Sequence, residues 1–467
     1  MLAALLLASC GGAADNRMAV TIVGDGPLAD ELVSGASTVT LVMRDGTGAL
    51  VPGAASSWRF LDEGSSLILR IRPARWPQGR DLTAADIVAS LRRTAVRPTL
   101  AAAALGRADA VRAPTARVLE LRTEAISPWL LDWLAEPELM VMRRRGPAFP
   151  GPYAAESLDG VTTLTRSSDS ALPDALPAQI TLVRSTDPAA AAAGFTRRES
   201  DVVIGEGLTG LFAARSVGQG GALRLETPRG VYGYAVTGRR GPLGNGDVRL
   251  ALAMAIDRAA LADRFGIALM QPLEQLAPGP APAAGDWRAL PMAQRLDRAR
   301  TLMAAAGHDP ARPLILRLLL PPGLEHRQIA ETVAAGWEGL GVRLIVAQGD
   351  TKARTQALRR GPHDLVVTDR SSAVADPAAL LLPLRCQNGG ACMAGADRLL
   401  AAALAATTPA SRAAGLAAAE AAYMQAPPLL PLLTPLRWSL VARGVEGWTP
   451  NAAGVHPLGR LTRSPAR

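Results

Sequence analysis

The spacing of apolar residues predicts a first half of the chain that is rich in short strands. Four apolar or alternating runs have the length and period of buried or half-buried strands: residues 18–24, 38–43, 67–72 and 118–122. Residues 146–190 are rich in Pro, Gly, Ser and Asp, which predicts loops with short strands such as 180–184. A short helix is expected at 129–135. We therefore expect a β-rich and irregular first half.

The pattern changes at Asp247, where helical spacing begins. Residues 248–265 predict one helix with Asp247 as its N-cap. Helices and strands then alternate: helix 296–306, strand 313–320, helix 325–339, strand 342–347, helix 351–360 and strand 364–368. This order predicts an α/β unit with a largely parallel sheet. An Ala-rich helical stretch at 399–422 is expected to break at Thr407–Pro409, and residues 429–442 supply apolar strand material.

Turn and capping residues support several of these elements. Asp45–Gly48 predicts a hairpin turn. Thr83 is placed to cap a helix over residues 83–93, with Asp86 three residues on as a capping-box-like partner. Residues 205–210 (GEGLTG) fit the letters of a dinucleotide-binding G-x-G-x-x-G motif. No βαβ unit surrounds them, so we interpret this segment as a loop.

Composition narrows the class of protein. The 467 residues are enough for two or more structural units, and 49% hydrophobic against 19% charged residues is ordinary globular chemistry. The formal net charge is +9, and Lys352 is the only lysine. The arginines are scattered, without the basic stripe and interleaved aromatics that nucleic-acid binding uses. We therefore expect no nucleic-acid partner.

The N-terminus resembles the leader of an exported lipoprotein. Residues 1–9 (MLAALLLAS) are an apolar run that ends in a small residue before Cys10. Leu7–Cys10 resembles a lipobox, which implies a signal peptide at 1–9, lipidation of Cys10 and a tether at 10–16. The run is too short to span a bilayer and lacks a positive n-region, so an upstream start or a chance match are the alternatives. We expect a periplasmic protein that reaches the membrane only through its lipid anchor.

Two further cysteines form a candidate disulfide. Cys386 and Cys392 are separated by five residues, two of them glycine. In an oxidising compartment this pair predicts a disulfide that closes a short loop. A metal site is the alternative, but no histidine or third cysteine lies nearby. The histidines are spread along the chain without ligand spacing: His308, His326, His363 and His456. We therefore expect no metal and no cofactor.

The chain lacks the sequence motifs of the common catalytic centres. It contains no G-x-S-x-G elbow, no P-loop and no H-E-x-x-H. No carboxylates are paired in an obvious catalytic way. Catalytic triads assemble in space and not in sequence, so absent motifs lower the odds of an enzyme without excluding one. We name no catalytic residue and expect a binding protein.

Four blocks of the sequence carry the motifs of one family: 58–94, 247–258, 299–345 and 426–458. The first contains Trp58, Trp76 and Leu82–Ile87 (LTAADI) around a strand hairpin and a helix. The second, DVRLALAMAIDR, is similar to V-R-x-A-L-x-x-A-I-D-R, and the third to A-x-x-L-L-x-x-A-G. The fourth contains Pro428–Leu432 and Val445–Trp448. In this order the blocks resemble the family 5 extracellular solute-binding proteins of peptide, nickel and opine ABC importers.

The resemblance implies an α/β fold: a two-lobed periplasmic-binding-protein-like clamp with mixed sheets. It would be of the large cluster-C type, with an extra β-rich subdomain in the first lobe. By analogy the first lobe is 17–238, the second α/β lobe is 239–438, and residues 439–467 return to the first lobe. Such a monomer would capture a small solute or peptide between its lobes, where a ligand is buried on nearly all sides. It would then deliver the solute to the permease and ATPase subunits of an ABC importer.

One segment departs from the peptide-binding members, which resemble G-W-x-A-D-Y-x-D-P and use the first Asp to anchor the ligand's α-amino group. With Asp376–Pro377 as the register, Arg370 takes the position of the Trp and Ala373 that of the anchoring Asp. The candidate ligand-binding residues are Arg370, Ser371, Ser372, Ala373, Tyr232 and Tyr234. An arginine in the cleft favours a carboxylate or phosphate group, whereas the alternative is that Arg370 faces solvent.

Two functions follow from the sequence. The first is a receptor for an ABC importer whose solute is a peptide or peptide-like molecule, with an anionic solute included. The second is a surface lipoprotein that has kept the fold but lost import and serves as a sensor or scaffold. The second function is motivated by Ala373 and by the short region before Trp58. A hydrolase would need a reactive residue in the cleft, and the sequence offers no candidate.

Overall fold

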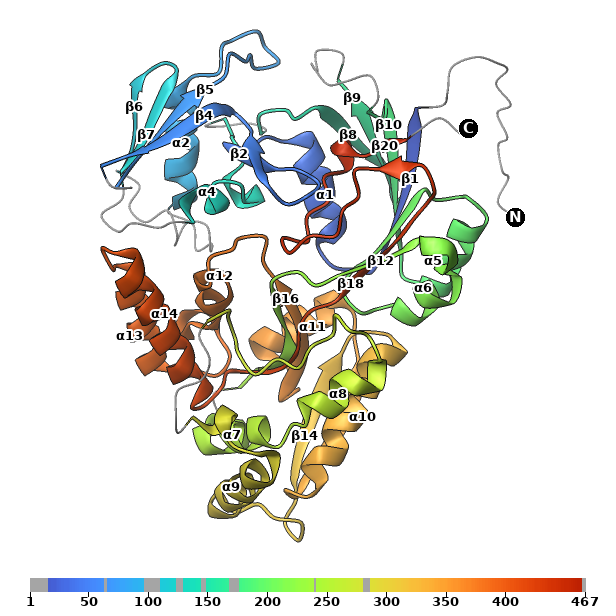
Figure 1. Cartoon of the computed structure of the whole chain (residues 1–467), viewed down its shortest axis with the longest axis vertical. Helices are drawn as coiled ribbons and strands as arrows, with labels where there is room; N and C mark the ends of the chain where they lie inside the picture. Colours follow the sequence, from blue (N-terminus) through green and yellow to red (C-terminus); the bar gives the residue numbers. More distant parts are fainter. Residues whose placement is uncertain are drawn as a thin grey trace.

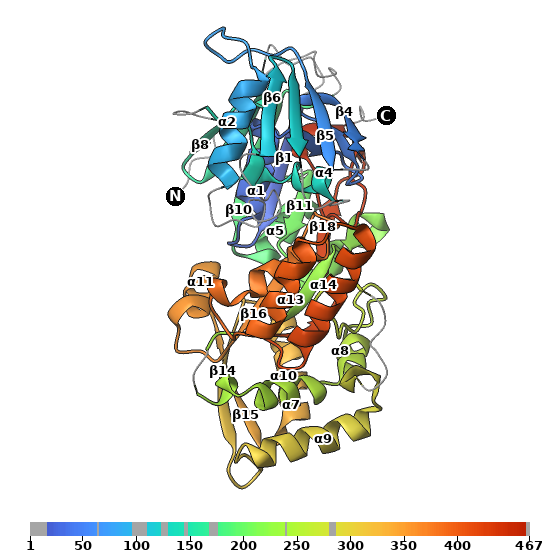
Figure 2. The ribbon, with the colours of Figure 1, turned by 90° about the vertical axis from the view of Figure 1, so that its left-hand side faces the viewer.

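The structure, a computed structural model, contains two lobes stacked along its long axis (Figures 1 and 2). It describes residues 16–463 apart from 63–64, 96–109, 123–128, 144–147, 168–175, 239–240 and 280–285. The signal peptide predicted at 1–9, the lipidation site Cys10 and all of the tether except Asn16 lie outside the described residues. No helix within the described ranges has the length and apolarity that crossing a membrane requires.

A seven-stranded mixed sheet forms the centre of the first lobe. Its order is β12 (Leu223–Glu226), β18 (Arg437–Val441), β11 (Val202–Gly205), β1 (Arg17–Val23), β10 (Gln179–Ser185), β9 (Val161–Arg166) and β8 (Tyr153–Leu158). β1 pairs in parallel with both β10 and β11, and the outer pairs are antiparallel. The faces are covered by α1 (Leu28–Ser37), which packs on β8 and β9, and by α5 (Pro188–Thr196) and α6 (Leu211–Val217).

The first lobe also carries the expected β-rich subdomain. Its antiparallel sheet has the order β4 (Ala55–Leu61), β5 (Ser66–Ile71), β7 (Val118–Arg122) and β6 (Val111–Thr115). The predicted hairpin turn joins β2 (Val42–Arg44) to β3 (Leu50–Pro52). Helices α2 (Ala84–Ala95) and α4 (Leu130–Trp133) complete the unit. The capping box before α2 is confirmed, because Thr83 N donates to Asp86 Oδ2 (3.0 Å) and Asp86 N to Thr83 Oγ1 (3.3 Å).

The second lobe is built on a five-stranded sheet. Its order is β15 (Val342–Gln348), β14 (Leu314–Leu320), β16 (Leu365–Ser371), β13 (Gly230–Val236) and β17 (Leu429–Leu433). β14 runs parallel to β15 and β16, whereas β13 is antiparallel to β16 and β17. The α/β alternation is confirmed by α9 (Met292–Ala305), α10 (Leu324–Glu338) and α11 (Thr351–Arg360). The sheet is mixed rather than largely parallel, because β13 and β17 come from outside the alternating segment.

Two helical stretches of the second lobe are each divided into two helices. The predicted break in the Ala-rich stretch is confirmed: α13 (Ala394–Leu404) ends before α14 (Pro409–Met424), and Thr408 caps α14. The prediction of one helix at 248–265 is wrong, because α7 (Gly246–Met254) and α8 (Arg258–Phe265) are separate. Asn245 rather than Asp247 caps α7. The break frees two carbonyl oxygens of the preceding turn for the buried guanidinium of Arg258.

The chain crosses between the lobes at two places that differ from the predicted boundaries. β13 belongs to the second sheet, so the first crossing lies at 227–229 and not at 238. β18 belongs to the first sheet, so the return crossing lies at 434–436 and not at 438. Both strands are largely buried, and the pattern of a buried strand does not show which sheet it joins.

Candidate functional site

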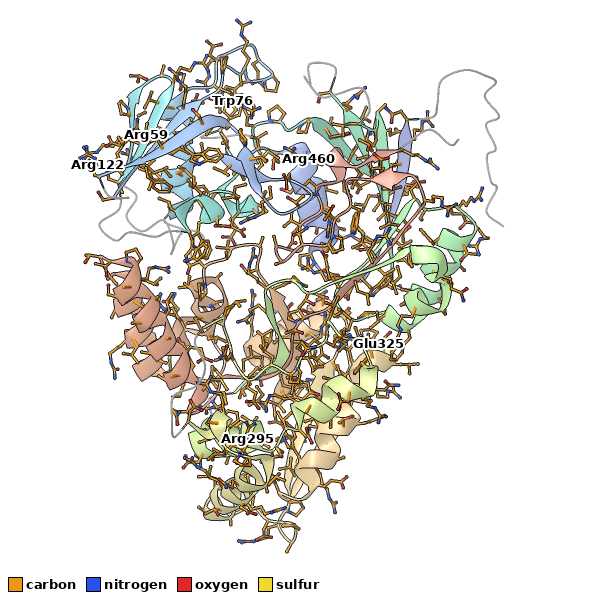
Figure 3. All side chains as sticks on the ribbon, in the orientation of Figure 1. Arg59, Trp76, Arg122, Arg295, Glu325 and Arg460 are labelled. Atoms are coloured by element: carbon orange, nitrogen blue, oxygen red, sulfur yellow. A yellow bond between two sulfur atoms is a disulfide. The ribbon has the colours of Figure 1, made fainter. Side chains whose placement is uncertain are left out.

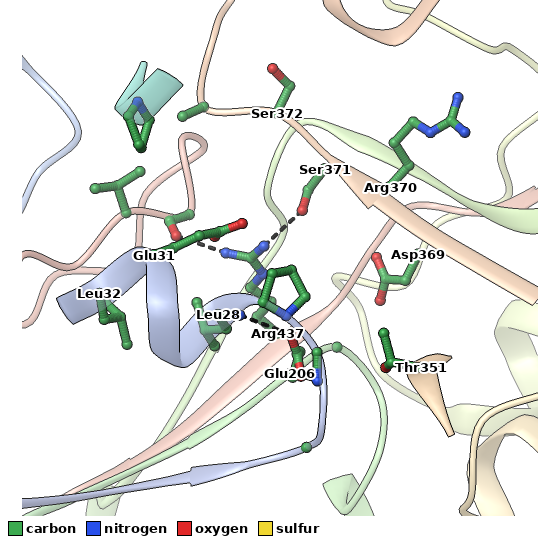
Figure 4. A pocket seen from close by; sticks show the side chains of 18 of the residues that line it. Leu28, Glu31, Leu32, Glu206, Thr351, Asp369, Arg370, Ser371, Ser372 and Arg437 are labelled. Atoms are coloured by element: carbon green, nitrogen blue, oxygen red, sulfur yellow. Dashed lines mark hydrogen bonds between the residues drawn. The ribbon is translucent and has the colours of Figure 1, made fainter. Parts of the chain in front are cut away.

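A cavity of about 990 Å³ lies between the two lobes. The first lobe lines it with the loop after β1, with α1 and with residues 133–138. The second lobe lines it with the end of β16 and the start of α11. Arg437 and residues 453–457 complete the wall. Figure 4 shows these side chains converging on one space, whose size suits a small organic solute or a short peptide.

Strand order explains why the first-lobe loops open into this cavity. β1 and β11 are parallel neighbours and end side by side at Val23 and Gly205. Ligand sites in such sheets lie at the carboxyl ends of the strands. The loop after β11 is the GEGLTG segment, and its Glu206 carboxylate accepts hydrogen bonds from the backbone N–H groups of Gly26 and Leu28. A protein carboxylate therefore occupies the start of α1, and the helix that follows the segment itself is α6. The interpretation of this segment as a loop is confirmed.

Asp369 is a carboxylate of the second-lobe wall. It lies at the end of β16 with its side chain exposed to the cavity (Figure 4). The protein around it raises the pKa of this carboxyl to about 6, against the opposing effect of Arg437. No hydrogen bond or ion pair reaches the carboxylate from any residue that the structure describes. Gly207 faces it across the lobe boundary, and a Cβ at this glycine would clash with Asp369 Oδ2.

Two of the first-lobe carboxylates that line the cavity have raised pKa values. Glu31 lies on α1 and Glu136 in the turn after α4. Burial raises the pKa of Glu136 to about 7 although Arg44 opposes the shift. Burial also raises the pKa of Glu31, again with an opposing arginine, Arg437. Within the described ranges, neither carboxylate has a hydrogen-bond or ion-pair partner.

The arginines of the wall are mostly engaged by the protein itself. Arg44 pairs with Asp132 at 2.9 Å. Arg437 donates to Ser371 Oγ and to a carbonyl oxygen, both at 2.8 Å. Arg354 donates to a threonine hydroxyl at 2.7 Å. Three of the four arginines that line the cavity therefore already have acceptors.

The predicted site residues fall into two groups. Residues 370–373 line the cavity: Arg370, Ser371, Ser372 and Ala373. Figure 4 shows the Arg370 side chain directed away from Asp369 and Ser371, because successive residues of a strand point to opposite faces. Its Nη1 is buried and has no hydrogen-bond partner in the described part of the chain.

Tyr232 and Tyr234 do not reach the cavity. Both side chains are fully buried, because β13 lies between β16 and β17 and both of its faces are covered. The Tyr232 hydroxyl donates to His326 Nδ1 at 2.8 Å. Burial lowers the pKa of His326 to about 3, so the ring is neutral. The Thr209 hydroxyl donates to Pro322 O at 3.2 Å, so it accepts from His326 Nε2 at 3.0 Å. We therefore assign Tyr232 to a hydrogen-bond chain that links the second lobe to the first, and not to the ligand site.

Two other contacts join the lobes around the cavity. Thr351 N and Oγ1, at the start of α11, each donate to the Asp25 carboxylate at 2.7 Å. Trp133 Nε1, from the subdomain, donates to Asp376 Oδ2 at 3.0 Å. Asp376 is itself held by a buried bidentate pair with Arg412. Figure 3 marks Glu325 at the same boundary, where its carboxylate accepts from a backbone N–H of α6.

Sequence reasoning missed Glu31, Glu136 and Asp369. Asp369 carried a usable signal, because it is the first charged residue after the apolar part of a predicted strand, where ligands bind in open α/β sheets. Glu31 and Glu136 carried none, since their positions depend on how the lobes meet.

The two remaining cysteines lie outside the cavity lining. Cys386 and Cys392 are joined by a disulfide, with their Cα atoms 4.7 Å apart. Within the described ranges, no group of three or more His, Cys, Asp or Glu side chains could hold a metal ion.

The two lobes, the double crossing and the enclosed cavity define a solute-binding clamp. The chain belongs to the bacterial extracellular solute-binding proteins, family 5, whose middle-region model matches residues 49–391. This is a family of binding proteins, so the chain is not an enzyme.

Two curated relatives from Escherichia coli (strain K12) match the sequence. The periplasmic murein peptide-binding protein MppA is 29% identical over 234 residues, which is 48% of this chain and 43% of MppA. The alignment thus spans less than half of that relative. The probable deoxycholate-binding periplasmic protein YgiS is 27% identical over 385 residues, 74% of this chain and 72% of YgiS.

Solved structures show the same fold. The E. coli murein tripeptide-binding protein MppA superposes with a TM-score of 0.83 at 21% identity, covering 96% of this chain and 98% of that chain. Haemophilus influenzae OppA in complex with RPPGFSPFR gives 0.80 at 18% identity, covering 96% and 99%. The ABC transporter-associated periplasmic binding protein DppA from Helicobacter pylori, in complex with the peptide STSA, gives 0.78 at 16%, covering 96% and 98%.

Proposed function

We propose that this protein is the receptor of an ABC importer, which captures a peptide or peptide-like solute between its lobes and delivers it to the permease. The observation that carries the proposal is the cavity of about 990 Å³ whose wall is shared by both lobes. A ligand in this space would contact both lobes at once and stabilise their approach. The peptides bound in the OppA and DppA structures, RPPGFSPFR and STSA, support this ligand class by similarity.

The ligand itself must be identified from the protein. We expect native mass spectrometry of the purified full chain to reveal a co-purified solute in the mass range of short peptides. Adding that solute to stripped protein should raise the melting temperature by mass action. A protein that carries no solute, and whose melting temperature no di-, tri- or oligopeptide shifts, would contradict the proposal.

An anionic solute has little geometric support. That idea depended on Arg370, but its side chain is directed away from Asp369 and Ser371 (Figure 4). The other arginines of the wall have acceptors within the protein. We therefore keep a peptide or peptide-like solute and set the anionic charge aside.

We also propose that the protein acts in the periplasm and is anchored through lipid on Cys10. The lipobox-like Leu7–Cys10 and the periplasmic location named for MppA and YgiS support this. Replacing Cys10 with serine should move the protein from the membrane fraction to the soluble fraction. Unchanged membrane partitioning would contradict the lipid anchor, whereas Cys386→Ser serves as a control that leaves partitioning unaffected.

A sensor or scaffold that no longer takes part in import is the second candidate. Ala373, at the position of the family's anchoring Asp, favours it because the usual ammonium ligand is missing. The two functions differ in cells. Deleting the gene should abolish uptake of the radiolabelled co-purified solute if the protein is an import receptor, and should leave uptake unchanged if it is a sensor.

A further inference from the structure

The cavity wall carries an excess of negative charge. Seven carboxylate side chains line it, against four arginines and no lysine. Three of the seven have clear structural partners, since Glu206 accepts from the start of α1, Asp25 from Thr351 and Asp350 from Ala353 N. The arginines do not balance the remainder, because Arg44, Arg354 and Arg437 have protein acceptors of their own. Charges of one sign that face one cavity repel each other, and an opposite charge that joins them is favoured.

The carboxylates without partners lie on opposite walls. Asp369 projects from the end of β16 on the second lobe, and Glu31 and Glu136 project from the first lobe. The charged groups that act on Asp369 are Arg437, Glu206 and Arg354. Arg437 and Glu206 act on Glu31 as well, and Figure 4 shows the guanidinium of Arg437 between Glu31 and Asp369. One small cation could therefore not serve both walls.

The charged groups around Glu136 are mostly acidic, so the first-lobe wall is negative as well. Glu136 is surrounded by further carboxylates and by one cation, Arg44, which already pairs with Asp132. These carboxylates are Glu31 on α1, Asp132 on α4 and Glu138 in the following turn. Three more acids thus surround Glu136, and only one arginine opposes them. The first-lobe wall is a second negative position.

We infer that the solute carries at least two positively charged groups, one bound by Asp369 on the second lobe and one by Glu31 and Glu136 on the first. The inference rests on the proposed function, because it concerns the ligand of the same cavity. An ammonium or guanidinium group donates strong charge-assisted hydrogen bonds to a carboxylate. A peptide with basic side chains and a polyamine both present two such groups.

Protonation of the Glu136 and Asp369 carboxyls makes binding pH-dependent. Since the pKa of Glu136 is about 7 and that of Asp369 about 6, both carboxyls hold protons in part at pH 6.5. A bound cation favours the ionised form and displaces these protons. Affinity for a dication should therefore rise between pH 5.5 and 7.5, with release of protons on binding.

Titration calorimetry with peptides of one length and different charge tests the inference. The probes are trilysine, trialanine and triglutamate, with spermidine as the polyamine probe. Trilysine should bind the stripped full-length protein about 10-fold to 100-fold more tightly than trialanine, the range of one or two charge-assisted hydrogen bonds. Triglutamate should bind more weakly than either. Repeating the trilysine titration at pH 6.5 in buffers of different ionisation enthalpy should show proton release.

The outcomes separate the inference from the proposed function. Trialanine or triglutamate binding as tightly as trilysine would overturn the inference and leave peptide capture intact. Spermidine binding in the absence of any peptide binding would support two cationic subsites but overturn the peptide class. Failure of every probe to bind would overturn both.

Isosteric variants test each wall. Asp369→Asn and Glu136→Gln should each weaken trilysine binding by about 10-fold or more and reduce proton release. Asp263→Asn and Glu331→Gln are matched controls, because both residues are exposed and lie outside the cavity lining. Since both cavity variants remove an unpaired charge, they should still fold, which circular dichroism checks. Equal affinity of Asp369→Asn and the wild type for trilysine would overturn the inference.

Discussion

Polar groups at the lobe junction and polar groups in the cavity wall are treated differently by the fold. At the junction, Tyr232, His326 and Thr209 form a complete hydrogen-bond chain. Asp376 there is satisfied by a buried arginine and by Trp133. In the cavity wall, Glu31, Glu136 and Asp369 have no partner among the residues that the structure describes.

The difference shows which polar groups hold the structure and which are left for a ligand. The junction follows the rule that buried polar groups in folded proteins are hydrogen-bonded, whereas the wall carboxylates are exposed or half-buried and face the cavity. Carboxylates with raised pKa values in a cleft are typical of functional sites. Changes at the junction should therefore destabilise the protein, whereas changes in the wall should alter binding.

Breaking the Asp376–Arg412 pair should have the largest effect. Arg412→Met leaves the Asp376 carboxylate buried without its cation, which should lower the free energy of unfolding by about 3–5 kcal/mol. Arg300→Met is the control, because its pair with Asp297 is exposed and should contribute less than about 1 kcal/mol. Urea unfolding measures both. Adding Asp376→Asn should recover much of the loss, and no recovery would contradict the charge explanation.

Tyr232 and Tyr234 on β13 form a matched pair, for which we expect the next-largest effect on stability. Tyr232→Phe removes the donor to buried His326 Nδ1 and should lower stability by about 1–3 kcal/mol. Tyr234→Phe removes a buried hydroxyl that has no partner in the described part of the chain, so stability should stay equal or rise. Denaturant midpoints distinguish the two variants. Neither should alter ligand affinity, and a loss of binding in Tyr234→Phe would argue for a ligand role after all.

Asp369→Asn should move stability in the opposite direction. The pKa of Asp369 in the folded state, about 6, lies above its ordinary value of 3.8, so ionisation is unfavourable in the fold. The resulting destabilisation is absent below the ordinary value and fully present above pH 6. The variant should therefore melt a few degrees higher than the ligand-free wild type at pH 7.5, with a smaller gap at pH 4.5. A gap that does not depend on pH would contradict this account.

The smallest effect is expected at the Asp25–Thr351 contact. Thr351→Val removes one of the two hydrogen bonds to Asp25 and the hydroxyl that accepts from Arg354, in a partly exposed position. Stability should fall by about 0.5–1 kcal/mol. Affinity for the ligand should fall by only a few-fold, because Asp25 keeps the hydrogen bond from Thr351 N and the two lobes stay in contact there. A loss as large as that in Asp369→Asn would place Thr351 among the ligand contacts.

Local pattern predicted most of the second lobe. The alternation of helices and strands over 296–368 is found in α9–α11 and β14–β16 because each element depends on its own period and caps. The break between α7 and α8 was not predictable, since Arg258 also donates to the carbonyls of Leu273 and Pro431, which are distant in sequence. Long-range partners decide such details.

The candidate site was predictable only where it follows a motif. Residues 370–373, chosen from the register at Asp376–Pro377, line the cavity, whereas Tyr232 lies in the core because of its strand position. Glu136 lies in an irregular turn of the first lobe and meets the second lobe only in the folded molecule. Which wall residues lack partners depends on side-chain contacts that no spacing encodes.

The position of β18 has a consequence for the order of assembly. This strand comes from residues 437–441, yet it lies between β11 and β12 in the first-lobe sheet. All strands of the second-lobe sheet lie within 230–433, so that sheet can close before the first. A chain that emerges N-terminus first therefore leaves β11 with an open edge until its last residues arrive, which exposes it to mispairing and aggregation. The N-terminal lobe is the last to be finished.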